Sequence, residues 1–174
     1  MSAETSVRWV SRPAKLGGEL AVPGDKSISH RSLILNAMAH GSARITGLSN
    51  GEDVMSTLDC LRRMGAEITQ GSIPGEYTIV GRGPVLQEPL DILDAGNSGT
   101  SMRLLSGLLA AQPFLSVLTG DASLRSRPMR RIVEPLQQMG AQVLGRQNGS
   151  LAPLVIQGGS LRGIDYDLPV ASPR

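Results

Sequence analysis

The sequence predicts a mixed α/β (α+β) fold built from repeated β-α-β-α-β-β units. The first observation is an internal repeat, because residues 61–68 (LRRMGAEI) recur 75 residues later as residues 136–143 (LQQMGAQV). The second is that Arg31 aligns with Arg103, and Ala39 with Ala111, at a spacing of 72 residues. The third is that 40% of the 174 residues are apolar, which is enough for a hydrophobic core. We therefore expect an N-terminal segment over 1–19, two complete units over about 20–89 and 90–163, and the start of a third over 164–174.

Each element of the first unit follows from its local sequence pattern. Val54, Leu58 and Leu61 recur at helical spacing, and Gly65 supplies a stop after them. The expected elements are, in order, a strand over 19–22, a Gly- and Ser-bearing loop over 23–29, a helix over 31–40 closed by Gly41, a strand over 43–48, a helix over 53–64, and strands over 66–69 and 77–80.

The second unit repeats this order, and a third begins after it. Met129, Ile132, Val133 and Leu136 trace one helical face, but Pro135 lies inside it, where proline costs about 3 kcal/mol. We expect a kink there, or a carbonyl group satisfied by other means. Residues 164–172 align with 90–98, and only two residues follow them. The pattern predicts that the chain is a fragment of a longer repeat protein.

Composition excludes several classes of function. Aromatic residues make up 2% of the chain and the net charge is +2, which argues against nucleic-acid binding. No stretch approaches the roughly 20 apolar residues of a membrane span, and no apolar signal core opens the chain. The single Cys60 excludes a disulfide framework and a Cys/His zinc site, while His30 and His40 lack acidic partners at ligand spacing. We expect a cytoplasmic protein that binds no membrane and no metal.

Two loops occupy equivalent places in the two units, each before a predicted helix. Loop one (residues 23–31) carries Lys26, Ser27 and Arg31, and loop two (residues 94–103) is rich in small residues and ends at Arg103. Backbone N–H groups at a helix start, combined with cations, suit a phosphate or carboxylate group. The alternative is that both loops are only helix caps, with surface cations in loop one and close helix packing in loop two. Their shared place in the repeat favours binding.

A third basic segment precedes the second helix of the second unit. Loop three (residues 120–131) contains four arginines, of which Arg127 stands directly before Pro128, at a predicted first helical position. This places the Arg127 guanidinium near a helix N-terminus. We expect Arg125, Arg130 and Arg131 to be surface residues.

Three motifs in these loops closely resemble the signatures of the EPSP synthases, the 3-phosphoshikimate 1-carboxyvinyltransferases. They are GDKSISHR at 24–31, GNSGTSMR at 96–103, and GDASLRSRPM at 120–129. The resemblance runs from about Leu20 to Ser172 and is specific, because the motifs, their order and the repeat agree. It implies the enolpyruvyl transferase fold, an inside-out α/β barrel, of which this chain holds two of six units and the start of the third.

The resemblance also implies an activity and a set of substrate-binding residues. The family transfers the enolpyruvyl group of phosphoenolpyruvate to the 5-hydroxyl of shikimate 3-phosphate in aromatic amino acid biosynthesis. It releases phosphate, proceeds by addition and elimination, and uses no metal or organic cofactor. The phosphoenolpyruvate-competitive herbicide glyphosate is an expected ligand. By position, the implied residues are Lys26 for both substrates, Ser27, Arg31 and Ser172 for shikimate 3-phosphate, and Gly99 and Arg127 for phosphoenolpyruvate, with Asn97 and Arg103 as secondary members of its loop.

The sequence departs from the family after Ser172, where a small residue and a substrate-binding glutamine are replaced by Pro173 and Arg174. The family's acid and base carboxylates belong to a C-terminal portion, so we expect this chain to hold half of the cleft and to be inactive alone. A non-catalytic substrate-binding or complementing fragment is the alternative. The sister family that acts on UDP-N-acetylglucosamine is less favoured, because it uses a loop cysteine and loop three has none.

Overall fold

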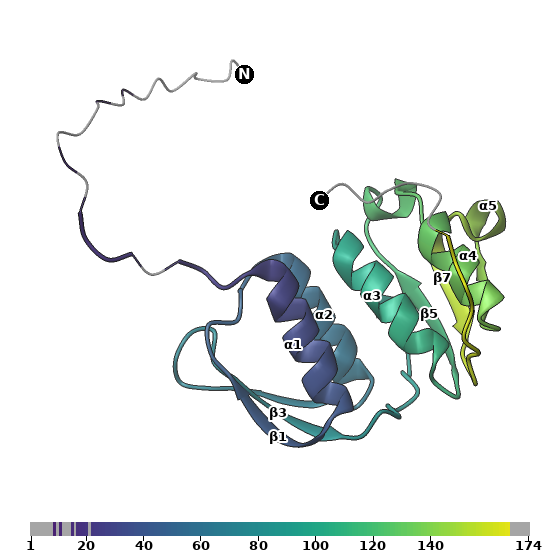
Figure 1. The fold of residues 1–174 in the computed structure, drawn as a ribbon, viewed down its shortest axis with the longest axis horizontal. Helices are drawn as coiled ribbons and strands as arrows, with labels where there is room; N and C mark the ends of the chain where they lie inside the picture. Colours follow the sequence, from purple (N-terminus) through teal and green to yellow (C-terminus); the bar gives the residue numbers. More distant parts are fainter. Residues whose placement is uncertain (1–8, 10, 12–14, 16, 21, 168–174) are drawn as a thin grey trace.

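The computed structural model shows two α/β units lying side by side, and it describes residues 9, 11, 15, 17–20 and 22–167 (Figure 1). The elements of the first unit are α1 (Lys26–Met38), β1 (His40–Ile45), α2 (Glu52–Arg63), β2 (Glu67–Gln70) and β3 (Tyr77–Arg82). Those of the second unit are β4 (Leu93–Asp94), α3 (Gly99–Ala110), β5 (Leu115–Thr119), the 3₁₀ turn η1 (Leu124–Ser126), α4 (Arg130–Gln138), β6 (Gln142–Gly145), α5 (Arg146–Gly149) and β7 (Leu151–Gln157). The mixed α/β class is confirmed, and the second unit has the predicted β-α-β-α-β-β order apart from two short additional turns, η1 and α5.

Each unit has its own sheet. The first sheet has the strand order β1-β3-β2, with both pairs antiparallel, and the second has the order β4-β5-β7-β6. In the second sheet β4 lies parallel to β5, with Leu93 opposite Leu118, while the other pairs are antiparallel. The second sheet therefore repeats the first and adds β4 at one edge.

The strand predicted over 19–22 is wrong for the residues described there. Glu19, Leu20 and Val22 lie outside any strand, and the side chains of Leu20 and Val22 are 86% and 75% exposed. A strand is stabilised by cross-strand packing and by the burial of one of its faces, and neither of these two apolar side chains is buried. The edge of β1 that corresponds to the β4 position thus has no partner among the described residues.

The start of α1 also differs from the prediction. The helix begins at Lys26, five residues before the predicted start, because the Asp25 side chain accepts a 2.7 Å hydrogen bond from the Ile28 backbone N–H. It ends at Met38, so Gly41 is not its stop. Gly41 lies inside β1 with a φ of 104°, and His40 opens that strand rather than ending a helix.

The predicted end of α2 is confirmed. Gly65 adopts a φ of 82°, its N–H donates to the carbonyl of Arg62, and the N–H of Ala66 donates to the carbonyl of Leu61. This is the Schellman pattern, which satisfies the last carbonyl groups of a helix.

The helix α4 begins later than predicted. Pro128 and Met129 lie before it, and the Met129 backbone N–H, at the helix cap, donates to the carbonyl of Ser150 at 2.8 Å. Pro135 does lie inside the helix, with Val133 and Leu136 buried on its inner face. The kink stays a prediction.

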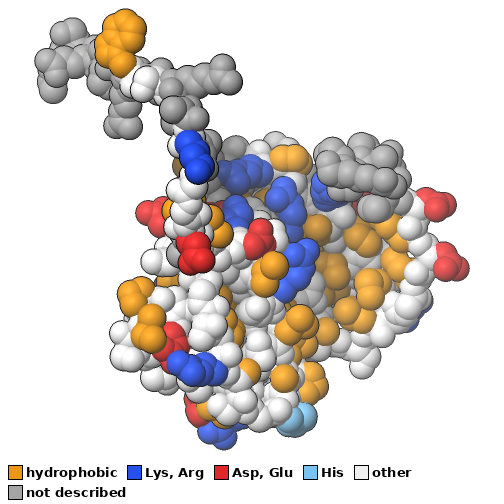
Figure 2. All heavy atoms as spheres, turned by 60° about the vertical axis from the view of Figure 1, so that its left-hand side comes forward, with side chains coloured by type: hydrophobic (Ala, Val, Ile, Leu, Met, Phe, Trp, Pro, Cys, Tyr) orange, Lys and Arg blue, Asp and Glu red, His pale blue; other side chains and the backbone are white. Residues whose placement is uncertain are grey.

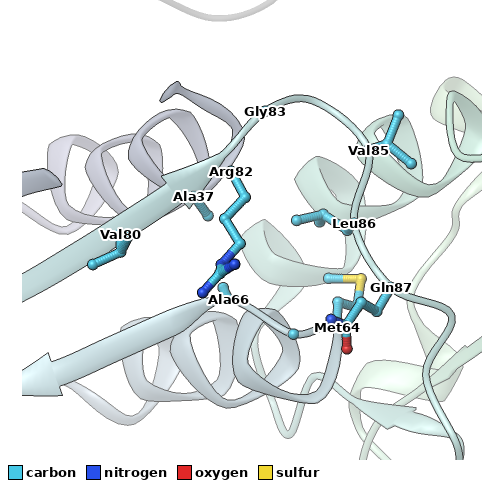
Figure 3. Close-up of a pocket in the computed structure, with 10 residues that line it drawn as sticks. Ala37, Met64, Ala66, Val80, Arg82, Gly83, Val85, Leu86 and Gln87 are labelled. Atoms are coloured by element: carbon cyan, nitrogen blue, oxygen red, sulfur yellow. The ribbon is translucent and has the colours of Figure 1, made fainter. Parts of the chain in front are cut away.

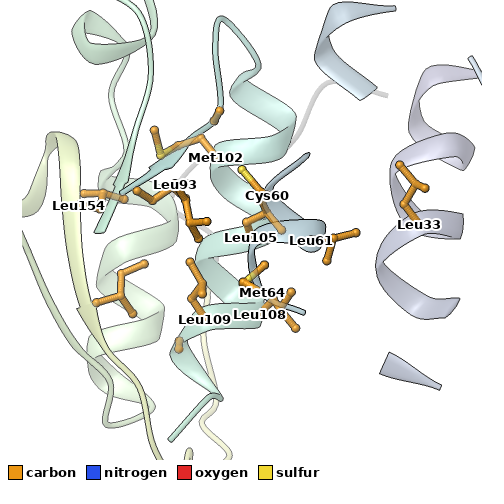
Figure 4. Packing of buried hydrophobic residues seen from close by; sticks show 14 of the residues in the cluster. Leu33, Cys60, Leu61, Met64, Leu93, Met102, Leu105, Leu108, Leu109 and Leu154 are labelled. Carbon is orange, nitrogen blue, oxygen red and sulfur yellow. The ribbon is translucent and has the colours of Figure 1, made fainter. Parts of the chain in front are cut away.

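The hydrophobic core is formed mainly by three helices that lie side by side between the sheets (Figures 1 and 4). Helix α1 packs on β3, α3 packs on β5 and β7, and α2 lies against both helices. Leu33 of α1, Leu61 of α2, Met64 directly after α2, and Leu105 and Leu109 of α3 are completely buried. Because the core joins both units, it holds the N-terminal ends of α1, α2 and α3 at the same end of the molecule (Figure 1).

Candidate anion-binding site

Basic side chains gather at the end of the molecule where α1 and α3 begin. Figure 2 shows Lys and Arg side chains grouped near one end of a face whose remaining length carries many hydrophobic side chains. Loop one and loop two both reach this end, as their shared place in the repeat predicts. Helix N-termini present unpaired backbone N–H groups and a partial positive charge, and both of these attract anions. Both loops therefore have the backbone groups that an anion-binding site needs.

Loop one is held tightly against the rest of the first unit. A Cβ atom at Gly24 would lie 1.8 Å from the carbonyl oxygen of Gly47, so only glycine allows this approach of the two backbones. Ser29 is buried, donates its hydroxyl to the Asp25 carbonyl at 2.7 Å, and accepts from the Ser49 N–H at 3.0 Å. These contacts fix the first turn of α1 and leave Ser27 exposed to solvent.

The Lys26 ammonium group is bound to a carboxylate from the start of α2. Its Nζ lies 2.6 Å from Oδ2 of Asp53, and the two side chains are 53% and 29% exposed. Arg31, one turn along α1, donates to the carbonyl of Ser27 at 3.3 Å and is exposed. The exposed ion pair between Lys26 and Asp53 contributes little to stability, but it fixes the position of the Lys26 ammonium group.

Loop two and loop three meet at Gly99. A Cβ atom on Gly99 would lie 2.8 Å from Nη1 of Arg103 and 3.3 Å from Nη1 of Arg127, so both guanidinium groups stand over this glycine. The helix beneath them is capped by Ser98, whose Oγ accepts from the Ser101 N–H at 3.1 Å. The structure thus brings three of the predicted residues together at the N-terminus of α3.

Arg103 is the more enclosed of the two cations. It donates to the carbonyls of Gly99 at 3.3 Å and Pro128 at 3.4 Å, while its buried Nε has no hydrogen-bond partner among the described residues. Burial, together with the nearby charges of Arg131 and Arg127, lowers the pKa of Arg103 from its ordinary value. An arginine remains charged near neutrality, so two positive charges are held close together, and an anion would relieve their repulsion.

Asn97 and Asp121 orient Arg127. The Nη2 of Arg127 donates to Oδ1 of Asn97, and Nδ2 of Asn97 donates to Oδ2 of Asp121 at 2.6 Å. The second carboxylate oxygen of Asp121 accepts from the Leu124 N–H at 2.7 Å. That hydrogen bond, followed by the one from Asn97, holds the pKa of Asp121 below its ordinary value. Arg127 is therefore aimed by a hydrogen-bonded chain of side chains.

The structure places the predicted residues in two adjacent groups. Lys26, Ser27 and Arg31 lie on the first turns of α1, and the second group contains Asn97, Gly99, Arg103 and Arg127. Ser172 lies outside the described residues. The expectation that Arg125 is a surface residue is wrong in part, because it is half-buried and donates to the Gly120 carbonyl at 2.6 Å.

Sequence reasoning missed two carboxylates that position these cations. Asp53 carries no local signal, because its partner Lys26 is 27 residues away. Asp121 lies inside the third motif, and an acid among four arginines was the signal that could have identified it.

A hollow on the other side of the first unit does not have the chemistry of a site (Figure 3). It has a volume of about 50 Å³, and its lining includes Met64, Val85 and Leu86. The cation there, Arg82, is paired with Glu67. Among residues 22–167, no group of three or more His, Cys, Asp and Glu side chains could hold a metal ion, and no helix is long and apolar enough to cross a membrane.

The family model described as EPSP synthase (3-phosphoshikimate 1-carboxyvinyltransferase) matches residues 10–174. A 3-phosphoshikimate 1-carboxyvinyltransferase of Herpetosiphon aurantiacus is 58% identical over 164 residues, which are 94% of this chain and 38% of the relative. The enzyme of the same description from Citrifermentans bemidjiense is 57% identical over 167 residues, again 94% of this chain and 38% of the relative. The chain thus spans well under half the length of the curated relatives it matches.

A solved structure agrees with these relatives. The EPSP synthase of Acinetobacter baumannii superposes with a TM-score of 0.84 at 53% sequence identity, covering 89% of this chain and 35% of the solved chain. At that identity the similarity covers the sequence as well as the fold.

Proposed function

Because the chain belongs to the EPSP synthase family, we propose that it supplies one side of the substrate cleft of an enolpyruvyl transferase. The reaction joins the 5-hydroxyl oxygen of shikimate 3-phosphate, which gives up its proton, to C2 of phosphoenolpyruvate while C3 gains a proton. The tetrahedral adduct then loses phosphate from C2 and a proton from C3, which restores the C2–C3 double bond and leaves an enol ether as the product. The observation that carries the proposal is the convergence of Arg103 and Arg127 over Gly99, beside the loop that carries Lys26.

Both substrates are anions at neutral pH, and each group of residues suits one of them. Ser27 and Arg31 would bind shikimate 3-phosphate, with Ser172 as a further ligand, and Lys26 would contact both substrates. Gly99 and Arg127 would bind phosphoenolpyruvate, because a guanidinium group and close backbone approach suit its carboxylate and phosphate. Asn97 and Arg103 would support that second group through the contacts described above.

Positioning and charge stabilisation are the contributions that these residues would make. Cations placed before the reaction stabilise the charge that develops on the departing phosphate, without reorganising during the step. We place the acid and base carboxylates in the part of the relatives that this chain does not span. The proposed setting is the cytoplasm, since a lone unpaired Cys60 suits a reducing compartment.

The related transferase that acts on UDP-N-acetylglucosamine fits less well. That family uses a cysteine in the loop that corresponds to loop three, and loop three of this chain contains no cysteine. Cys60 is buried in α2 and donates to the Asp94 carbonyl at 3.3 Å. It lies on a different element from Arg127.

A chimera tests the proposal. Residues 10–174 would replace the matching 38% of the Herpetosiphon aurantiacus relative, and phosphate release from phosphoenolpyruvate and shikimate 3-phosphate would be measured. We expect the chimera to turn over and the 174-residue chain alone to show no turnover. An inactive chimera, or rapid turnover by the chain alone, would contradict the proposal.

Lys26→Met in the chimera should lower kcat/KM by at least about 100-fold, because it removes a cation shared by both substrates. Lys15→Met is the matched control, since Lys15 is the other of the two lysines of the chain and is exposed. Near-normal kcat/KM for Lys26→Met would reject the assignment of Lys26.

A further inference from the structure

A buried polar cluster joins the first turns of α1 and α3 through α2. His30 of α1, Thr57 of α2, and Ser98 and Ser101 at the start of α3 are all completely buried. The Nδ1 of His30 lies 2.8 Å from Oγ1 of Thr57, which lies 2.7 Å from Oγ of Ser101. The Ser101 hydroxyl is in turn 2.9 Å from the backbone carbonyl oxygen of Asp53 and 2.7 Å from Oγ of Ser98. Apolar residues of the core, including Leu33 and Met102, follow directly along α1 and α3 (Figure 4).

The chemistry of these groups gives the cluster a direction. A hydroxyl group has one proton, and a carbonyl oxygen can only accept. The Ser101 hydroxyl therefore donates its proton to the backbone carbonyl oxygen of Asp53. Thr57 must then donate to Ser101, and it must accept from Nδ1–H of His30. This order leaves Nε2 of His30 without a proton, in agreement with its having no partner among the described residues.

The neutral state of His30 is supported by its surroundings. Burial lowers the pKa of His30 from its ordinary value, and the positive charges of Lys26 and Arg31 act in the same direction, against the opposing effect of Asp53. A neutral ring carries a single proton, which the cluster places on Nδ1.

The cluster connects the two groups of the anion-binding site. Asp53 holds Lys26 with its carboxylate and accepts from Ser101 with its backbone carbonyl. Ser98 caps the helix on which Gly99 stands. Any displacement of loop one relative to loop two would therefore break a buried hydrogen bond, which leaves an unsatisfied polar group at a high cost in free energy.

We propose that Thr57 and Ser101 are positioning residues, which hold the shikimate 3-phosphate loop at a fixed place relative to the phosphoenolpyruvate loop. This inference rests on the proposed function for the identity of the two substrates. The hydroxyl groups of Thr57 and Ser101 transmit the position of one loop to the other without contacting either substrate. The neutral Nδ1–H form of His30 anchors the chain of hydrogen bonds at α1.

The ring nitrogens of His30 report the direction of the cluster. Nitrogen-15 NMR of the 174-residue chain should show Nδ1 protonated and Nε2 unprotonated at pH 7, with the exposed His40 as the internal reference. His40→Gln assigns the two sets of signals. Protonation of Nε2 instead would overturn the assigned direction.

Amide NMR of the same chain tests the positioning role. Added shikimate 3-phosphate should shift the amide signals of Ser27 and Ile28 in loop one and, through the cluster, those of Gly99 and Thr100 in loop two. Thr57→Val should leave the loop-one response intact and reduce the loop-two response about fivefold or more. Thr57→Ser, which restores the hydroxyl group, should restore that response.

The control is Ser106→Ala, because Ser106 is an equally buried hydroxyl of α3 that donates to the Met102 carbonyl of its own helix at 2.7 Å. It should leave both responses unchanged. An undiminished loop-two response in Thr57→Val, or no rescue by Thr57→Ser, would overturn the inference and leave the proposed function standing. Absence of any response in the unsubstituted chain would instead contradict the substrate assignment itself.

Discussion

The carboxylate of Asp121 accepts a 2.6 Å hydrogen bond from the side-chain amide of Asn97. The contact decides which way the amide faces, and so leaves the Asn97 oxygen to accept from Arg127. Because the same carboxylate also accepts from the Leu124 N–H, the turn before α4 and the direction of Arg127 depend on one ionised group.

Stability should therefore depend on the charge of Asp121. Its pKa in the folded chain is lowered, first by the Leu124 hydrogen bond and then by Asn97, so its contribution is present above the unfolded pKa of about 3.9 and is lost as the pH falls through the folded value. Thermal unfolding of the chain and of Asp121→Asn should show a gap in Tm that is constant above about pH 5 and shrinks below about pH 4. Asp91→Asn, at an exposed carboxylate that accepts from the neighbouring Ile92 N–H, is the control. A gap that does not change with pH would contradict this role.

Removal of Arg127 should weaken the binding of phosphoenolpyruvate and of glyphosate. In the chimera, Arg127→Ala should raise the KM for phosphoenolpyruvate and the inhibition constant of glyphosate by about tenfold or more, because a charge-assisted hydrogen bond is lost. Arg130→Ala is the matched control, since Arg130 pairs with Glu134 on the exposed side of α4. An unchanged KM for phosphoenolpyruvate would contradict the proposal that Arg127 binds this substrate.

The chain should self-associate through an apolar groove between α1 and α3. The groove has a volume of about 370 Å³, and Leu35, which lines it, is 65% exposed. Exposed contiguous apolar surface of this kind favours association. Its lining residues are Arg31, Ile34, Leu35, Met38, Leu104, Gly107, Leu108 and Ala111.

Sedimentation velocity at increasing concentration should show oligomers of the unsubstituted chain, and Leu35→Glu should shift the population to monomer. Ile73→Glu changes an equally apolar residue that is 59% exposed but lies outside the groove, and it should leave association unchanged. A monomeric unsubstituted chain would show that the groove does not drive association.

Cys60 should be unreactive while the chain is folded. Burial raises the pKa of its thiol to about 12, so the reactive thiolate is scarce at neutral pH. Iodoacetamide at pH 8 should label Cys60 only after denaturation, as followed by mass spectrometry. Rapid labelling of the folded chain would indicate that α2 opens locally.

Local patterns in the sequence predicted much of the fold. Helix α2 and its Gly65 stop were predicted closely, because helical periodicity and the glycine conformation are properties of adjacent residues. The starts of α1 and α4 differ from the prediction, because the first residue of a helix depends on hydrogen bonds that the apolar pattern does not show. The Asp25 side chain caps α1 five residues before the predicted start, and Met129, before α4, donates its N–H to the distant Ser150 carbonyl.

The sequence by itself determined the α/β class, the order of elements in the second unit, the family, and the loops that carry Lys26, Gly99 and Arg127. These features depend on residue spacings and short motifs, which can be identified in the sequence without knowing the path of the backbone. Only the tertiary structure decided that Asp53 binds both loops, since its partners Lys26 and Ser101 lie 27 and 48 residues away. Contacts of that kind have no local signature, because they depend on the path of the backbone and on the packing of α1, α2 and α3 around one core.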